Sequence, residues 1–156
     1  MTGRQAEPDE KGKTTRTAHE ERFAQLFGGL SDPAYLVETQ SGLILACNAA
    51  AAEQTGYSMR ELVGKNIATD MLPAGEEPNS AAVAARLAVG SSERFVRRKQ
   101  RKNGTTYVEE IVVIPFGHAP QGLHISINHD ITDRVEKECA VAESEARYRS
   151  IFESTT

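Results

Sequence analysis

The sequence feature that most constrains the fold is an Asn-Gly pair, Asn103-Gly104, set between two long segments that we predict as strands. An Asn-Gly pair readily takes the positive backbone φ angles of a type I′ turn, which joins neighbouring antiparallel strands. The flanking runs span roughly Glu93 to Lys102 and Thr105 to Phe116. The pattern therefore predicts a long antiparallel hairpin closed by a type I′ turn.

Three shorter segments extend this predicted sheet. Ala34 to Thr39 and Leu43 to Cys47 are rich in β-forming residues, and the Gln-Ser-Gly between them is typical of a hairpin. Beyond the long hairpin and a loop through Pro120, the residues Leu123, Ile125 and Ile127 alternate with His124, Ser126 and Asn128. Such alternation predicts a half-buried strand.

Helix signals lie between and around the strands. Asn48 precedes four alanines as a helix N-cap, with Gly56 as the stop. Ser58 and Glu61 form an S-x-x-E capping box for a second short helix. A longer helix is predicted over residues 79–90, and a polar, Glu-rich helix from about residue 132 to the end.

The N-terminal part divides into two. Residues 1–17 are polar and charged without periodic apolar residues, which predicts a disordered tail. Phe23, Leu26, Phe27 and Leu30 then follow the spacing of an amphipathic helix. Together the elements predict an α+β domain: a five-stranded antiparallel sheet with short helices on one face and flanking N- and C-terminal helices. A small-molecule pocket is expected between the sheet and the helices.

Charge argues against a general affinity for nucleic acid or anionic membrane, because 18 basic and 22 acidic side chains give a net charge of -4. Basic residues do gather in the predicted hairpin, but successive side chains on a strand face opposite ways, and Phe95 is the one aromatic among them. We interpret this cluster as a solvated hairpin that resists edge pairing. Its members are Arg94, Arg97, Arg98, Lys99, Arg101 and Lys102.

The cellular compartment is predicted from what the chain lacks. The longest nearly apolar run, Gly42 to Ala52, is too short to cross a bilayer, and no secretory signal is visible at the N-terminus. Cys47 and Cys139 lie far apart and form no pair motif, which argues against a disulfide or a thiolate metal site. We expect a cytoplasmic protein with no membrane contact in this chain.

The ordered motifs of the chain resemble a PAS domain with its C-terminal PAC motif, over about Phe23 to Arg134. The residues that carry the resemblance are Gly42-Leu43-Ile44, Asn48-Ala49-Ala50, Thr55-Gly56-Tyr57, Glu61-Leu62-Val63-Gly64-Lys65, Arg98-Lys99-Gln100-Arg101-Lys102-Asn103-Gly104-Thr105 and His129-Asp130-Ile131-Thr132-Asp133-Arg134. The five-stranded antiparallel sheet that the resemblance implies matches the elements predicted above. We assign residues 18–134 to this domain.

An internal repeat concerns the remaining residues, 135–156. Glu20, Arg22, Phe23, Leu26 and Phe27 recur at a constant offset as Glu145, Arg147, Tyr148, Ile151 and Phe152. The repeat predicts that residues 135–156 form an exit, or signalling, helix that runs into the first helix of a truncated second PAS domain. Chance similarity between two amphipathic helices is the alternative.

The resemblance also bears on cofactors. Haem-binding members of the family use a histidine on the long helix before the central hairpin, and light-sensing LOV members use a cysteine near residues 66–70 to attack a flavin. Neither residue is present at those positions, since Cys47 and Cys139 lie elsewhere. A histidine-ligated haem on the long helix and a cysteinyl flavin are therefore disfavoured. A non-covalent flavin, a small metabolite, a haem held by another ligand and an empty core stay open.

Catalysis by this chain is not expected. It contains no phosphate-binding Gly-rich loop, no nucleophile elbow and no H-E-x-x-H motif. His124 and His129 fall on opposite faces of one strand and cannot share a metal, and Glu109 and Glu110 likewise face apart. No metal site is predicted.

The resemblance implies a sensory and signal-relay module that binds a small ligand or partner. Its signal would pass through the C-terminal helix to an effector such as a sensor histidine kinase or a diguanylate cyclase. Asp130 and Thr132 are the relay candidates, because the family's motif joins the last strand to the exit helix there; helix capping is the simpler and compatible interpretation. The pocket candidates are Tyr35, Val37, Ile44, Val83, Leu87, Val112, Ile125 and Ile127.

The alternative function is a ligand-free dimerisation module whose core is filled by side chains. Small residues on the long helix, among them Ala84 and Ala88, fit either function, because they leave space for a ligand or let the helix approach the sheet. The expected partners are a second copy of the chain in a homodimer, a downstream effector domain and a small molecule, with no nucleic acid.

Overall fold

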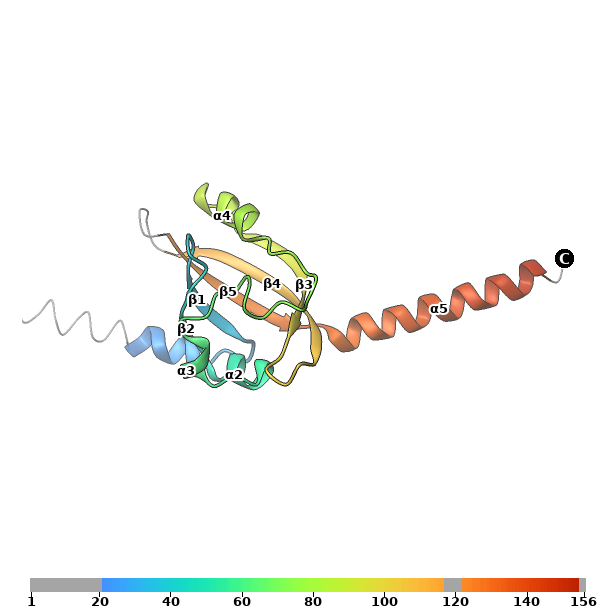
Figure 1. Cartoon of the computed structure of the whole chain (residues 1–156), viewed down its shortest axis with the longest axis horizontal. Coiled ribbons are helices and arrows are strands. Elements are labelled where there is room, and N and C mark those ends of the chain that lie inside the picture. The colour runs from blue at the N-terminus through green and yellow to red at the C-terminus, as the bar shows by residue number, and fades with distance from the viewer. Residues whose placement is uncertain (1–20, 117–121, 155–156) are drawn as a thin grey trace, which may run out of the picture.

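The computed structural model describes residues 21–116 and 122–154. The predicted disordered tail, the loop through Pro120 and the histidines at 19 and 118 lie outside the described residues. Figure 1 shows a curved sheet with helices packed against it and one long helix that extends away from it.

The sheet has five strands in the order β2-β1-β5-β4-β3, and every neighbouring pair is antiparallel. The strands are β1 (Ala34–Glu38), β2 (Ile44–Cys47), β3 (Glu93–Gln100), β4 (Thr106–Phe116) and β5 (Leu123–Asp130). The last strand of the sequence pairs between the first strand and β4, so β5 lies at the centre of the sheet. This architecture confirms the predicted α+β fold class.

The helices begin and end close to the predicted positions. Residues 21–28 are helical, and α2 (Ala49–Thr55), α3 (Met59–Leu62), α4 (Ser80–Ala88) and α5 (Thr132–Ser154) follow along the chain. Asn48 caps α2 by accepting a hydrogen bond from the Ala51 amide at 3.1 Å. Both hydrogen bonds of the predicted capping box are present, from the Glu61 amide to the Ser58 hydroxyl and from the Ser58 amide to the Glu61 carboxylate. The predicted caps at Asn48, Ser58 and Glu61 are thus confirmed.

The turn of the central hairpin differs from the predicted type I′. Among the described residues only glycines have positive φ, so Asn103 does not, while Gly104 has φ of 88°. The Gly104 amide donates to the Arg101 carbonyl at 2.9 Å, and the Arg101 amide donates to the Thr105 carbonyl at 2.8 Å. This is the pattern of a three-residue loop with a glycine bulge. The physical reason is local: the Asn103 side chain accepts from the Thr105 amide and hydroxyl, which leaves the left-handed position to the glycine.

The two faces of the sheet have different neighbours. We call the face that packs against α2, α3 and α4 the inner face, and the opposite one the outer face. Two clusters of buried side chains lie on the inner face: Tyr35, Val37, Ile44, Cys47, Ala51, Leu62 and Met71 beneath α2 and α3, and Leu87, Ile111 and Val113 beneath α4. Buried polar side chains on the strands also face inward, among them Lys99, Glu109 and Asn128.

The C-terminal helix α5 leaves the domain after its first turn. It buries none of its own side chains, whereas Ile131, just before it, is 5% exposed and packs into the domain. Figure 1 shows the rest of α5 extending into open space. Among the described residues, no helix has the length and apolar character needed to cross a membrane.

Candidate functional site

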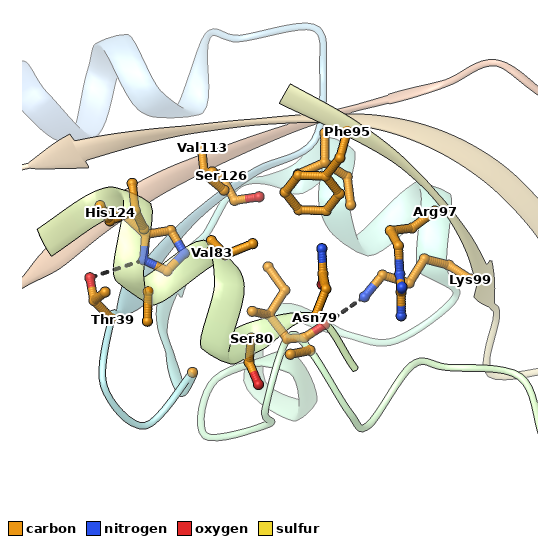
Figure 2. A pocket seen from close by; sticks show the side chains of 16 residues that line it. Thr39, Asn79, Ser80, Val83, Phe95, Arg97, Lys99, Val113, His124 and Ser126 are labelled. Atoms are coloured by element: carbon orange, nitrogen blue, oxygen red, sulfur yellow. Dashed lines mark hydrogen bonds between the residues drawn. The ribbon is translucent and has the colours of Figure 1, made fainter. Parts of the chain in front are cut away.

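A cavity lies between α4 and the inner face of the sheet (Figure 2). Its apolar wall consists of Val83, Leu87, Phe95, Ile111 and Val113. Its polar lining comes from separate parts of the chain and includes Thr39, Asn79, Arg97, Lys99, His124 and Ser126. Figure 2 shows His124 and Thr39 at one end of the cavity, Arg97 and Lys99 at the other, and Val83 between them. The site therefore combines an apolar middle with two polar ends.

The structure gathers only part of the predicted pocket at this cavity. Val83 and Leu87 line it. Tyr35, Val37 and Ile44 belong instead to the buried cluster beneath α2 and α3. Their packing there makes them core residues.

The prediction that Val112, Ile125 and Ile127 line the pocket is wrong, because the structure places them on the outer face. Val112 pairs with Ile127 across β4 and β5, and all three side chains are only half-buried. The inward positions of β5 are occupied by His124, Ser126 and Asn128. Alternation along a strand shows that two faces differ but does not show which one meets the helices. The polar set faces inward here because it has hydrogen-bond partners there.

The interpretation of the basic cluster as wholly solvated is wrong for Lys99. Its side chain lies on the inner face and is 3% exposed, and its Nζ donates to the Ile67 carbonyl at 2.5 Å. Burial lowers the pKa of the Lys99 ammonium, partly offset by the nearby Glu109 carboxylate. The neighbouring Arg97 donates to the Glu77 carbonyl, while Arg94 is exposed on the outer face. The predicted split of the cluster between two faces is confirmed.

At the opposite end of the cavity, His124 is 5% exposed. Burial lowers its pKa to about 4, so the ring is neutral near pH 7. Its Nδ1 lies 3.1 Å from the Thr39 hydroxyl, which leaves Nε2 for another partner. A neutral imidazole offers one donor and one acceptor. This end of the cavity thus suits an uncharged polar group.

A buried carboxyl group with a strongly raised pKa belongs to Glu109, on the inner face of β4. It is 1% exposed, and burial raises its pKa to about 7 against the opposing effects of Lys99 and Asn128. Its oxygens accept from Asn128 Nδ2 at 2.8 Å and from Gln54 Nε2 at 3.1 Å. The Ser126 hydroxyl, which lines the cavity, donates to Asn128 Oδ1 at 2.7 Å. Hydrogen bonds therefore join the cavity wall to Glu109 and on to α2.

These contacts continue from α2 to the start of α5. Arg101 Nε donates to the Gln54 carbonyl at 2.8 Å, and its Nη2 pairs with Asp130 Oδ2 at 2.9 Å. Asp130 Oδ1 accepts from the Thr132 amide at 2.9 Å and from its hydroxyl at 2.5 Å. The Thr132 hydroxyl in turn accepts from the Val108 amide at 3.0 Å. Asp130 and Thr132, the relay candidates, thus lie where sheet, turn and exit helix meet.

Asn48 has a larger structural role than a cap. Besides its bond to Ala51, its Oδ1 accepts from the Ala34 amide at 3.0 Å. Its Nδ2 lies 3.0 Å from the Asp32 carbonyl and 3.3 Å from the Phe27 carbonyl, which can both accept from it. One buried side chain therefore ties the N-terminal helix, β1 and α2 together.

Comparison with known families supplies the identity that the fold suggests. The family model described as a PAS domain matches residues 32–133. The chain belongs to the PAS domain family. Residues 32–133 cover all five strands and α2, α3 and α4, so the inner-face cavity lies wholly within the PAS domain.

Solved structures with the same fold include three that differ widely in sequence from this PAS domain. The PAS domain of an HTR-like protein from Haloarcula marismortui is 18% identical, with a TM-score of 0.61, over 79% of this chain and 100% of the other. A domain of a sensory box sensor histidine kinase/response regulator from Geobacter sulfurreducens is 21% identical, with a TM-score of 0.61, over 74% and 96%. An RNA-binding light-oxygen-voltage receptor is 18% identical, with a TM-score of 0.71, over 91% of this chain and 41% of the receptor. No curated protein is significantly similar in sequence.

The cavity of this PAS domain has a volume of about 50 Å³. Pockets that hold drug-sized ligands measure about 300–1,000 Å³. A flavin or a haem does not fit the cavity in this conformation, whereas a few non-hydrogen atoms do. Among the described residues, no group of His, Cys, Asp and Glu side chains could hold a metal ion. The buried Cys47 lies outside the cavity, and burial raises the pKa of its thiol.

Sequence reasoning missed Glu109 and Lys99 as members of the site. The position of Glu109 in the sequence could have indicated its role. It is the one charged residue in an alternating set on β4 whose other members are Tyr107, Ile111 and Val113. The hairpin register puts Lys99 opposite Tyr107, on the same face. Extending the alternation from the hairpin across both strands would have placed the two charges on the same face, in diagonal positions of the two strands.

Proposed function

We propose that this PAS domain is a non-catalytic, cytoplasmic signal-relay module. A small ligand in the cavity beneath α4 alters the inner face of the sheet, and α5 carries the change to an effector domain of the parent protein, such as a sensor histidine kinase or a diguanylate cyclase. Membership of the PAS family supports the sensory role. No motif of a catalytic site is visible in the sequence, which supports a binding role for this chain.

The observation that carries the proposal is the unbroken set of polar contacts between the cavity and α5. Ser126 is part of the cavity wall, and Thr132 is the first residue of α5. The contacts between them are mostly buried or half-buried, where hydrogen bonds are stronger than in water and an unpaired group is costly. A ligand that takes the Ser126 hydroxyl as its partner would remove that donor from Asn128. The remaining contacts would then have to rearrange toward Asp130.

A change at Asp130 would reach α5 directly. Asp130 divides its two oxygens between Arg101 and Thr132, so a shift of the Arg101 ion pair alters the group that caps the helix. The first turn of α5 contacts the sheet, where Thr132 accepts from the Val108 amide and Arg134 pairs with Glu110 at 4.0 Å, and none of the described α5 side chains is buried. A helix whose first turn is joined to the sheet in this way can be redirected by small changes there.

We further propose that α5 self-associates. Val141, Tyr148 and Phe152 are exposed apolar residues at spacings of seven and four, the repeat of a coiled-coil seam. Ile131, just before α5, cannot extend this stripe, because it is buried against the sheet. A second copy of the chain is the partner that this stripe fits, as in a homodimer.

The relay is tested by nuclear magnetic resonance on Ser126→Ala. Removal of this hydroxyl should shift the backbone amide signals of Thr132 and Asp133, because Asn128 loses its donor and the contacts to Asp130 readjust. The same substitution in an Asp130→Ala background should leave those signals unmoved. Equal shifts in both backgrounds, or none in either, would show that α5 is only a linker.

Self-association is tested by sedimentation. The full chain should form a dimer that a chain ending at Arg134 does not form, and the parent protein carrying Asp130→Ala should lose its regulated output. Equal dimerisation by the shortened chain would contradict this part of the proposal.

The second candidate, a ligand-free dimerisation module, is supported by the outer face of the sheet. Val96, Ile114 and Phe116 are 52%, 40% and 42% exposed there, beside the half-buried Ile125 and Ile127. If the chain ending at Arg134 dimerises and Ser126→Ala leaves α5 unchanged, this second function is favoured.

A further inference from the structure

The geometry of the cavity points to a short-chain carboxylate as its ligand, with the carboxylate at Lys99 and the hydrocarbon between α4 and β4. This inference names the ligand class of the proposed sensory site and rests on that proposal. Its support comes from the cation, the apolar wall and the volume of the cavity.

Lys99 supplies the charge that the ligand would neutralise. An ammonium group has three donors, and among the described residues Nζ of Lys99 has one hydrogen-bond acceptor, the Ile67 carbonyl. In the part of the chain that the structure describes, no carboxylate lies within ion-pair distance of it. The Glu109 carboxylate acts on this ammonium only from beyond that distance, and a buried charge with no close counter-ion favours an anion in the cavity.

The lining selects an anion that has an apolar part. None of the described residues that line the cavity is an aspartate or a glutamate, and Arg97 adds a second cation at the Lys99 end (Figure 2). From that end the wall continues through Phe95, Val83 and Leu87. Inorganic anions gain nothing from such a wall, whereas each methylene group that is buried against it favours binding.

The volume limits the length of the hydrocarbon. The cavity measures about 50 Å³, well below the roughly 300–1,000 Å³ of pockets that hold drug-sized ligands. It therefore suits a ligand with only a few non-hydrogen atoms. Acetate, propionate and butyrate are acids of this size, and longer acids would have to move α4.

The bound anion would also change Glu109. Lys99 favours the carboxylate form of Glu109, and a second negative charge beside Lys99 would weaken that effect and promote protonation of Glu109. A protonated Glu109 is a weaker acceptor at the oxygen that carries the proton, so one of its bonds from Asn128 and Gln54 weakens. The ionisable groups around Glu109 are Lys99 and Arg97 on β3, Tyr107 on β4, Asp130 on β5 and Tyr35 on β1. Ligand binding is thereby linked to proton uptake at the first polar contact beyond the cavity.

Isothermal titration with acetate, propionate, butyrate, 1-butanol and inorganic phosphate tests the ligand class. Butyrate should bind at least tenfold more tightly than 1-butanol, which has the same hydrocarbon chain without the charge. It should also bind at least tenfold more tightly than phosphate, which has the charge without a hydrocarbon chain. Lys99→Met should lower butyrate affinity at least tenfold and leave 1-butanol unchanged. Lys137→Met, at an exposed position on α5, is the matched control and should change neither.

A second variant keeps the test decisive if Lys99→Met does not fold. Ala84 lines the cavity and is half-buried, so Ala84→Leu should fill the space and abolish binding of both butyrate and 1-butanol. Equal affinity for butyrate and 1-butanol, no binding of butyrate, or binding that survives Ala84→Leu would overturn the inference. None of those outcomes would contradict the proposed relay, because the amide shifts caused by Ser126→Ala are measured without a ligand.

Discussion

Replacing Glu109 by glutamine should make the stability of the protein respond differently to pH. The folded protein holds the Glu109 proton more tightly than the unfolded chain does, because burial raises the pKa from 4.5 to about 7. The stabilising effect is therefore complete below pH 4.5 and is lost as the pH rises through 7. Glu109→Gln fixes this position in an uncharged form and removes the loss.

The magnitude follows from the shift. One pKa unit corresponds to about 1.4 kcal/mol, so Glu109 removes about 3 kcal/mol from the free energy of unfolding between pH 4.5 and 7.5. His124 acts in the opposite sense: its pKa is lowered from 6.5 to about 4, so its contribution is present above pH 6.5 and is lost as the pH falls toward 4. The two effects overlap in the wild-type protein. The difference in unfolding free energy between wild type and Glu109→Gln isolates the effect of Glu109.

Urea unfolding followed by circular dichroism, at half-unit steps from pH 4.5 to 8, measures that difference. Glu109→Gln should gain about 3 kcal/mol relative to wild type across this range. The matched control is Glu110→Gln on the same strand, whose half-buried carboxylate faces outward and pairs with Arg94, and it should change stability by less than about 1 kcal/mol. A difference between wild type and Glu109→Gln that stays constant within about 0.5 kcal/mol would refute the argument from burial.

Three further predictions concern the fold and the cofactor. Asn48→Ala should lower the free energy of unfolding by more than about 3 kcal/mol, because it breaks several buried hydrogen bonds. Ser58→Ala should lower it by only about 1 kcal/mol, because it removes a single exposed cap. Urea unfolding of both variants measures the two losses. Deleting residues 1–17 should change the free energy of unfolding by less than about 1 kcal/mol, and a larger loss would mean that the tail packs against the domain. Absorption spectra of purified protein should show neither a Soret band that one His→Ala substitution abolishes nor a light-induced cysteinyl flavin adduct; either signal would contradict the cofactor prediction.

The elements that sequence reasoning placed well are those fixed by local chemistry. The Asn48 cap, the Ser58–Glu61 box and the hairpin at Gly104 depend on residues within a few positions of one another. Even there, the predicted turn type was wrong. The Asn103 side chain accepts a hydrogen bond from the Thr105 amide, and Asn103 therefore does not take the positive φ of a type I′ turn.

The candidate site depends on contacts that local patterns do not specify. The cavity brings together Thr39, Asn79, Lys99 and His124 from well-separated parts of the sequence. Apolar residues were assigned inward by default, which misplaced Val112, Ile125 and Ile127. Whether a polar residue such as Asn128 faces inward depends on whether it finds partners there, and that is decided by packing of the whole domain.

The orientation of β5 has a consequence for how the sheet forms. Moving β5 by one residue against its neighbours would turn Leu123, Ile125 and Ile127 toward the helices and bury more apolar surface. Hydrophobic collapse alone therefore favours a misaligned sheet. The native alignment is selected by polar pairing instead, since the slipped strand separates Asn128 from Glu109 and leaves a buried carboxyl group without its donor. The hydrogen bond between Asn128 and Glu109 thus disfavours the misaligned register of β5 during folding.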